Sequence, residues 1–142
     1  MARKLTPEEI YAYVDEAPRT AHIATVREDG RPHVAPIWVT VDNGDLVFTT
    51  WHTSVKGRNI ARTGRAALTI DDTAEGSSYV TIEGTVTMDP DPAQSRFWAT
   101  RIGGKYMGAD RAEEFGQRNG VPGEYVCRLT PTHMSGMRGV TD

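Results

Sequence analysis

The sequence predicts a mainly β (α+β) fold, an antiparallel β-barrel, closed or partly closed, of about six strands with short helices inserted. Segments rich in β-forming residues recur along the chain and are separated by turns, which favours strands connected as hairpins. The clearest turn is DNGD, because Asn43 and Gly44 both tolerate the positive φ angles of a tight hairpin. Gly84 lies inside the long segment YVTIEGTVTM, where it predicts a bulge or bend of the kind that barrels require.

The N-terminal third is expected to contain one helix followed by three consecutive antiparallel strands. Thr6 opens the run TPEE, which offers a hydroxyl cap, a proline in the first turn and a glutamate that completes a capping box. This helix should end before Pro18. A turn at Asp29 and Gly30 separates the first two strands. The three strands are expected at residues 21–26, 33–41 and 46–50.

The rest of the chain alternates between helices and strands. Ser54 is expected to cap a helix that ends near Gly64, a residue suited to a left-handed C-cap. Asp91 and the proline after it start a helix through QSRFWATRI, and ADRAEEFGQRNG predicts another that ends at Gly120. Strands are expected at residues 66–71, 79–88 and 124–130, the last of which can continue through THMSGM.

The composition is that of one ordinary globular domain covering residues 1–142. Hydrophobic residues make up 38% of the chain and charged residues 25%, which argues against a disordered or fibrous protein. A net charge of -3 disfavours a protein that coats nucleic acid. No run is long and apolar enough for a membrane helix, and the single Cys127 has no partner for a disulfide or a CxxC site. We therefore expect a cytoplasmic protein with no nucleic-acid partner, no membrane partner and, given four scattered histidines, no metal site.

The stretch TTWHTSVKGRNIAR concentrates positive charge in a chain that is acidic overall. Lys56, Arg58, Arg62 and Arg65 are four cations, and no carboxylate occurs between residues 45 and 71. A helix that begins here exposes unpaired backbone N–H groups and, with the neighbouring hydroxyls and cations, suits a phosphate group. The glycine between the first two cations would let a backbone amide approach that ligand. A partner surface or water could also balance the charge, since basic residues on a short helix are usually a solvated face and the serine can be a plain N-cap.

Four segments in this order, GRPHVAPIWV, LVFTTWHTSVKGRNIAR, AALTI and YVTIEGTVTM, resemble the pyridoxamine-phosphate-oxidase-like split β-barrel flavoproteins. The likeness is in particular to their branch of deazaflavin-dependent oxidoreductases, which use coenzyme F-420. It covers most of the chain, from Ala21 through KYMGADRAEEF to TPTHMSGM, and its most specific part is the strand ending in TT followed by Ser-x-Lys-x-Arg-Asn. The resemblance implies a split antiparallel β-barrel of the FMN-binding type, and a homodimer with its cofactor sites at the subunit interface.

The resemblance also implies the residues of the cofactor site. The phosphate end would be lined by Thr49, Thr50, Ser54, Lys56, Gly57, Arg58 and Asn59. The strand beside the tricyclic ring would supply Pro36, Ile37 and Trp38. The subunit interface would place Trp98, Tyr106 and Met107 near the cofactor. For the apolar and aromatic members, the alternative is ordinary packing in the helices or the barrel core.

With such a cofactor, the implied activity is hydride transfer from reduced coenzyme F-420 to an electron-poor double bond of a small organic substrate. The cofactor brings the reactive chemistry, which agrees with the absence of a recognisable catalytic constellation in the sequence. The proton would come from solvent or from a nearby group such as His33 or Tyr79, each of which also has a structural interpretation.

Three alternatives stay open. FMN would fit the same fold and the same helix start, whereas Arg62 and Arg65 would suit the longer lactyl-oligoglutamate tail of coenzyme F-420. The protein could bind the deazaflavin without catalysis, or it could be a structural dimer that binds no anion. Oxidation of pyridoxamine phosphate is not expected, because the chain reads SGMRGVTD where such oxidases carry an arginine-rich, RLAP-like segment.

Overall fold

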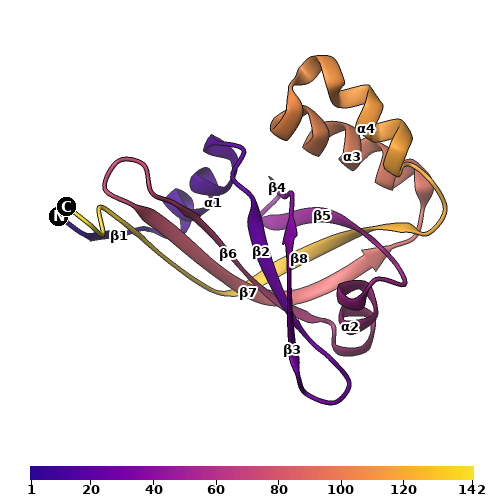
Figure 1. Ribbon diagram of the computed structural model, residues 1–142, viewed down its shortest axis with the longest axis horizontal. Coiled ribbons are helices and arrows are strands. Elements are labelled where there is room, and N and C mark those ends of the chain that lie inside the picture. Colours follow the sequence, from indigo (N-terminus) through magenta and orange to yellow (C-terminus); the bar gives the residue numbers. More distant parts are fainter.

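The computed structural model describes residues 1–142, folded into an eight-stranded antiparallel sheet with four α-helices (Figure 1). The strands are β1 (Arg3–Lys4), β2 (Ala21–Val26), β3 (Pro32–Ile37), β4 (Thr40–Asp42), β5 (Asp45–Trp51), β6 (Arg65–Asp72), β7 (Ser78–Asp89) and β8 (Glu124–Arg138). The helices are α1 (Pro7–Glu16), α2 (Val55–Thr63), α3 (Pro92–Met107) and α4 (Ala112–Asn119), with a 3₁₀ turn at Ala109–Arg111 before the last. No helix has the length and apolar character needed to span a membrane.

The sheet is curled into a split barrel. Its strand order is β3-β2-β6-β7-β8-β5-β4, with β1 added to β8, so β3 and β4 lie at opposite ends of the order. Yet only Trp38 and Val39 separate these two strands in the chain. Three Cα–Cα steps span at most about 11 Å, so the end of β3 and the start of β4 lie close together. The predicted fold class, a split antiparallel β-barrel with short peripheral helices, is confirmed.

The prediction of three consecutive antiparallel strands is wrong. Residues 33–41 form two strands, and β3 pairs with β2 whereas β4 pairs with β5. The alternation of side chains continues through the crossing, so the sequence pattern does not reveal where the hydrogen-bonding partner changes. This division and the short β1 account for eight strands in place of about six.

The turns and caps follow the sequence closely. Asn43 and Gly44 have φ angles of 49° and 79°, as a tight hairpin requires, and Gly64 ends α2 in the left-handed conformation. The capping box of α1 is complete, since Glu9 N–H donates to Thr6 Oγ1 at 3.2 Å and Thr6 N–H donates to the Glu9 carboxylate at 3.0 Å. The helix predicted to end near residue 102 continues to Met107.

One large core fills the curled sheet. It contains 19 buried apolar residues, contributed by the inner faces of the strands and by α1 and α2. Along β6 and β7 buried and exposed side chains alternate, as expected for strands with one face on a core. The pair α3–α4 lies outside this core, beside β5 and β8 (Figure 1). A small cluster joins them, in which Trp98 and Ile102 of α3 pack against Val47 of β5 and Val126 of β8.

Helix α3 holds the crossing segment in place. The Lys105 ammonium group donates to the carbonyls of Val14 at 2.7 Å and Val39 at 2.6 Å, and to the Asp15 carboxylate at 3.0 Å. All three of its N–H donors are therefore used, which offsets the cost of burying the charge. Burial lowers the pKa of Lys105, and the Asp15 carboxylate opposes this shift. The lysine thereby joins α3 to α1 and to the crossing between β3 and β4.

Gly84 gives a test of the bulge that bends β7. The register between β7 and β8 shifts between Glu83 and Gly84, and a Cβ atom at Gly84 would collide with the carbonyl of Thr130. We expect Gly84→Ala to lower the free energy of unfolding by about 1–3 kcal/mol, because backbone rather than a flexible side chain must move. Chemical denaturation measures this, with Thr85→Ala at the exposed neighbouring position as the control. An unchanged midpoint for Gly84→Ala would contradict the packing described here.

Candidate functional site

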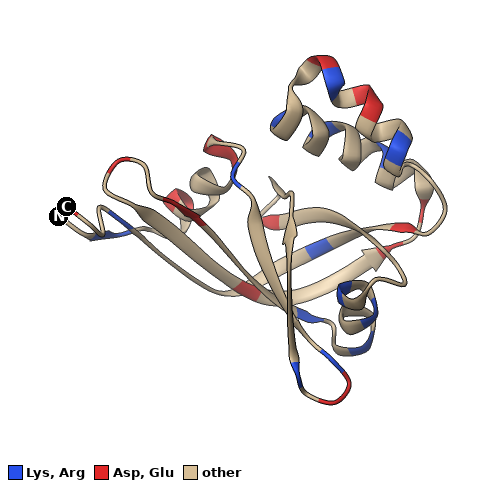
Figure 2. Ribbon diagram, viewed as in Figure 1, with Lys and Arg blue, Asp and Glu red and all other residues tan.

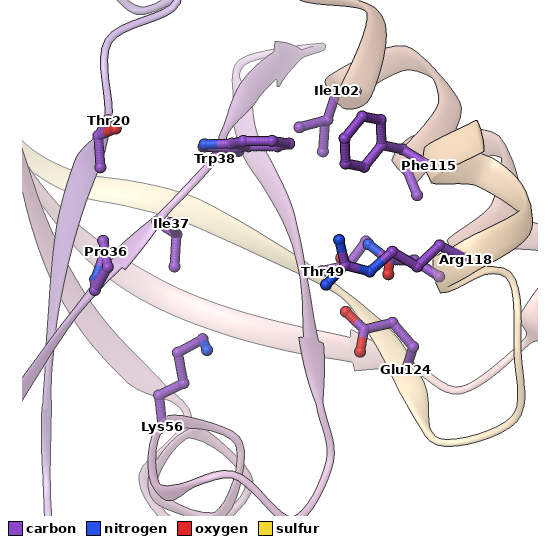
Figure 3. A pocket seen from close by; sticks show the side chains of 13 residues that line it. Thr20, Pro36, Ile37, Trp38, Thr49, Lys56, Ile102, Phe115, Arg118 and Glu124 are labelled. Carbon is purple, nitrogen blue, oxygen red and sulfur yellow. The ribbon is translucent and has the colours of Figure 1, made fainter. Parts of the chain in front are cut away.

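A cavity of about 470 Å³ opens between the curled sheet and the α3–α4 pair (Figure 3). Its walls come from Thr20 just before β2, the end of β3, β5, the first turn of α2, helices α3 and α4, and the first residue of β8. The lining residues are Thr20, Pro36, Ile37, Trp38, Thr49, Lys56, Ala99, Ile102, Gly103, Phe115, Arg118, Asn119 and Glu124. The volume falls in the range of pockets that bind drug-sized ligands and cofactors.

Lys56 points into this cavity from the first turn of α2 (Figure 3). Its side chain is half-buried and forms no ion pair or hydrogen bond with another residue of the chain. Helix α2 carries three basic residues and no carboxylate, so in Figure 2 it shows blue segments and no red ones. The positive end of the helix dipole adds to this charge. A half-buried cation without a partner, at a helix N-terminus and facing a cavity, favours an anionic ligand.

The loop before α2 fixes where Lys56 points. Ser54 Oγ accepts the Gly57 N–H at 3.1 Å and donates to the Trp51 carbonyl at 2.7 Å, and it lies 3.2 Å from Thr50 Oγ1. A Cβ atom at Gly57 would lie 2.6 Å from the Trp51 carbonyl oxygen. The close approach at Gly57 is thus made to the chain's own loop. An approach of its backbone to a ligand, as expected from the sequence, stays a prediction.

The other predicted polar residues of α2 do not face the cavity. Asn59 is buried, and its Nδ2 donates to Thr25 Oγ1 at 3.0 Å, which ties the helix to β2. Arg62 donates to the Val26 carbonyl and to Asn59 Oδ1. Arg58 is exposed to solvent. Of the four cations in the basic stretch, only Lys56 lines the cavity.

Aromatic rings form the opposite wall of the cavity. The rings of Trp38 and Tyr106 stack with centroids 5.0 Å apart and an angle of 6° between their planes. Phe115 meets Trp38 edge-on at 5.4 Å. It packs so closely on Gly103 that a Cβ atom there would lie 2.6 Å from Phe115 Cβ. This wall is rigid and apolar, and Trp38 lies across it in Figure 3.

The three residues assigned to the subunit interface lie near this wall but do not line the cavity. Trp98 is buried and belongs to the small cluster between α3 and the strands β5 and β8. Tyr106 stacks on Trp38, accepts the Val39 N–H at 3.2 Å and donates to the Arg19 carbonyl at 2.7 Å. Met107 is 39% exposed at the end of α3.

His33 and Tyr79, named from the sequence as candidate proton sources, do not line the cavity either. His33 lies on β3, and its Nδ1 is buried without a hydrogen-bond partner. Tyr79 is exposed on β7. Neither side chain is therefore positioned to supply a proton to a ligand in this cavity.

Sequence reasoning missed the part of the site that α4 and β8 contribute, above all Phe115, Arg118 and Glu124 (Figure 3). Glu124 reaches the cavity because it pairs with Trp51 at the end of β5, next to the TT segment. The sequence carries no local signal for this pairing, because β5 and β8 are far apart in the chain. The role of α4 depends on how the α3–α4 pair folds back, which no short motif encodes.

Two titratable groups near Lys56, the carboxyl group of Glu124 and the thiol of Cys127, have raised pKa values. Burial raises the pKa of Glu124, while the Thr49 hydroxyl and the charges of Lys56 and Arg118 oppose the shift. Burial likewise raises the pKa of Cys127 to about 12, so its thiol is neutral and unreactive. The polar end of the cavity therefore holds two cations, Lys56 and Arg118, against one carboxylate that is destabilised in its charged form.

Comparison with protein families gives one match over nearly the whole chain. The family model described as pyridoxamine 5'-phosphate oxidase matches residues 6–138. Pyridoxine/pyridoxamine 5'-phosphate oxidases of Burkholderia thailandensis and Burkholderia multivorans are 35% and 37% identical over 98 residues, or 68% of this chain. The match covers 45% of each of them, so the chain spans about half the length of the curated relatives it matches.

Solved structures with the same fold extend this comparison. An F-420 reductase is 28% identical with a TM-score of 0.69, and the match covers 87% of this chain and 94% of that one. A conserved hypothetical protein from Mycobacterium tuberculosis is 23% identical with a TM-score of 0.78, covering 92% of this chain and 84% of the other. An FAD-binding protein from Mesorhizobium loti is 16% identical with a TM-score of 0.72, covering 96% of both chains. At these identities the last two share the fold alone.

Gly57→Ala tests whether the loop positions Lys56. The added methyl group must displace the Trp51 carbonyl or the start of α2, at a cost of about 1–3 kcal/mol in the free energy of unfolding. We also expect the variant to bind phosphate-bearing ligands at least about tenfold more weakly, because a small misplacement of a charged contact is costly. Denaturation and calorimetric titration measure the two effects. Val55→Ala, at an exposed position two residues before Gly57, is the control, and equal behaviour of the two variants would refute the positioning role.

Proposed function

This chain belongs to the pyridoxamine 5'-phosphate oxidase family of oxidoreductases, and on that premise we propose that it is a coenzyme F-420-dependent reductase. In this proposal reduced coenzyme F-420 supplies the hydride that is added to an electron-poor double bond of a small organic substrate. The observation that carries the proposal is Lys56, a half-buried cation without a partner that faces a cavity with an aromatic wall.

The residues present fit a cofactor with an anionic tail and a flat ring. We propose that Lys56 binds the phosphate, with Thr49 beside it in the cavity, while the exposed Arg58 adds positive charge to the same helix without lining the cavity. Thr50, Ser54, Gly57 and Asn59 contribute by holding the loop and the helix start, through the hydrogen bonds and close packing described above. A ligand ring would lie along Pro36, Ile37 and Trp38.

The chain's own groups have three tasks in such a reaction. Lys56 anchors one end of the cofactor, so that the ring cannot slide along the cavity. Trp38, which stacks on Tyr106, presents an apolar surface that orients a ring and excludes water from it. No side chain is required as nucleophile, which agrees with a cavity whose only carboxylate is Glu124 and which holds no histidine.

The F-420 reductase comparison favours the deazaflavin over FMN. The match to this chain covers 94% of that protein's length, whereas the pyridoxine/pyridoxamine 5'-phosphate oxidases extend well beyond the matched segment. FMN is the second candidate, because its phosphate suits the same lysine. A third reading is a protein that binds coenzyme F-420 without catalysis. Turnover of enones or quinones with the reduced cofactor distinguishes an enzyme from such a binding protein.

Lys56→Ala tests the proposed anchor. Loss of a charge-assisted contact to phosphate should weaken coenzyme F-420 binding by about tenfold to a hundredfold, with little change in unfolding midpoint. Fluorescence titration at fixed salt measures the affinity, with FMN titrated in parallel. Lys4→Ala removes the same type of charge from β1, distant from the cavity, and is the control. Wild-type affinity in Lys56→Ala would remove the main support for the site.

We further propose that two copies of the chain form a homodimer. The family resemblance seen in the sequence implies the same assembly, with the cofactor sites at the subunit interface. β3 is an edge strand, and next to it the outer face exposes Val26 and, at 65% exposure, Val34. A second cavity of about 580 Å³ adjoins this face and is lined by small residues that include Ala24 and Ala67. An exposed apolar surface with small residues is typical of a protein contact.

Val34→Asp tests the homodimer. A carboxylate placed in an apolar contact is desolvated without a partner, so we expect the variant to elute with the mass of one chain. Size-exclusion chromatography with light scattering gives that mass. Val140→Asp places the same charge on another exposed valine, at the C-terminal end, and should keep the wild-type mass. A wild-type protein with the mass of one chain would refute the dimer.

A further inference from the structure

Glu124 is the only carboxylate on the wall of the cavity that holds Lys56. It is the first residue of β8 and pairs with Trp51 across the β5–β8 ladder, so its backbone is fixed by the sheet. Its side chain is half-buried and reaches into the cavity beside Arg118 and opposite Lys56 (Figure 3). A carboxylate is an unexpected group beside a site for an anion, because like charges repel.

The surroundings of Glu124 show what stabilises its charge. Lys56 on α2 and Arg118 on α4 are the two cations that act on it, and the Thr49 hydroxyl on β5 is the nearby polar group. On β8 itself, the buried thiol of Cys127 is the other titratable group that interacts with Glu124. The residues that β3 and α3 contribute to the wall carry no titratable side chain. The negative charge of Glu124 is therefore supported by the Thr49 hydroxyl and by two cations that an anionic ligand would also use.

We propose that Glu124 takes up a proton when a phosphate-bearing ligand binds at Lys56. The phosphate offsets the positive charge that keeps Glu124 ionised, and its own negative charge adds repulsion. A half-buried carboxyl group then becomes neutral, since the charged form is no longer supported. The neutral group can donate its O–H to the ligand, so binding converts a repulsive wall into a hydrogen-bond donor. This inference rests on the proposed anion site, and it concerns binding rather than turnover.

The sign of the pH dependence follows from linkage. Burial already raises the pKa of Glu124, and a ligand that raises it further binds more tightly to the protonated protein. Affinity should be highest below the pKa of Glu124 in the free protein. It should fall as the pH rises through the interval between the free and the bound pKa, by up to about tenfold per pH unit. Above that interval the affinity should be constant again.

Glu124→Gln is the test. The amide keeps the shape of the side chain and removes its charge, so the variant should bind at least about threefold more tightly than wild type at pH above that interval. Calorimetric titrations in two buffers of different ionisation enthalpy count the protons taken up on binding. Wild type should take up close to one proton more than Glu124→Gln inside the interval. Glu28→Gln, in the exposed turn between β2 and β3, should behave as wild type.

Three probes separate this inference from the proposed cofactor. Coenzyme F-420, FMN and inorganic phosphate are titrated in parallel, and Lys56→Ala identifies which of them binds at the lysine. If only inorganic phosphate binds there, the proposed function fails while the proton count still decides the role of Glu124. Equal proton uptake by wild type and Glu124→Gln, or no gain in affinity for Glu124→Gln, overturns the proposal. Binding of none of the three probes at Lys56 overturns it as well.

Glu124→Asp serves if the glutamine variant does not fold. The shorter side chain keeps a carboxyl group in the cavity, so it should retain proton uptake linked to binding. Its fall in affinity should occur at lower pH than in wild type, because an aspartate carboxyl group is intrinsically more acidic than that of glutamate. If Glu124 were purely structural, the fall would stay at the wild-type pH. An identical profile for Glu124→Asp and wild type, or a flat profile for both, would refute the proposal.

Discussion

The packing of Gly57 against the Trp51 carbonyl is the constraint on which the candidate site depends. With a Cβ only 2.6 Å from that oxygen, no other residue fits without moving backbone. The same turn is closed by Ser54, whose hydroxyl joins the Gly57 N–H to the Trp51 carbonyl. The start of α2 is therefore held at the end of β5, and the Lys56 side chain points into the cavity rather than out into solvent. A surface lysine with free rotation would lose far more entropy on binding a ligand.

A second constraint, the crossing between the sheet edges, brings the apolar wall to that lysine. Trp38 and Val39 carry the chain from β3 to β4, and Lys105 and Tyr106 on α3 bind the backbone of Val39. Tyr106 also stacks on Trp38, so one helix turn fixes both the position and the plane of the indole. The cavity thus has a charged end defined by a loop and an apolar end defined by a clamp. Such an arrangement suits a ligand with a phosphate at one end and a flat ring at the other.

Local chemistry made much of the fold predictable from the sequence. The hairpin at Asn43 and Gly44, the left-handed cap at Gly64 and the bulge at Gly84 each depend on a few adjacent residues. Lys56 could be proposed for the same reason, since a helix cap, a hydroxyl run and a cation are close in the sequence. These features needed no knowledge of distant contacts.

The remainder depends on long-range pairing. Side-chain alternation is the same on both sides of Val39, so the change of partner between β3 and β4 leaves no trace in the pattern. Arg118 and Glu124 reach the cavity only because α4 folds back on α3 and β8 pairs with β5. Gly103 is a further case in which a long-range contact decides the structure. Glycine disfavours helices, yet this one lies inside α3 because Phe115 packs directly on it.

The central claim is that a phosphate binds at the first turn of α2 and faces Glu124 across the cavity. A titration of ¹⁵N-labelled protein with coenzyme F-420, followed through backbone amide signals, tests this most directly. We expect saturable shifts concentrated at Lys56, Gly57 and the start of β8, with a single binding constant. Shifts confined to the outer face around Val34, or none in α2, would contradict it.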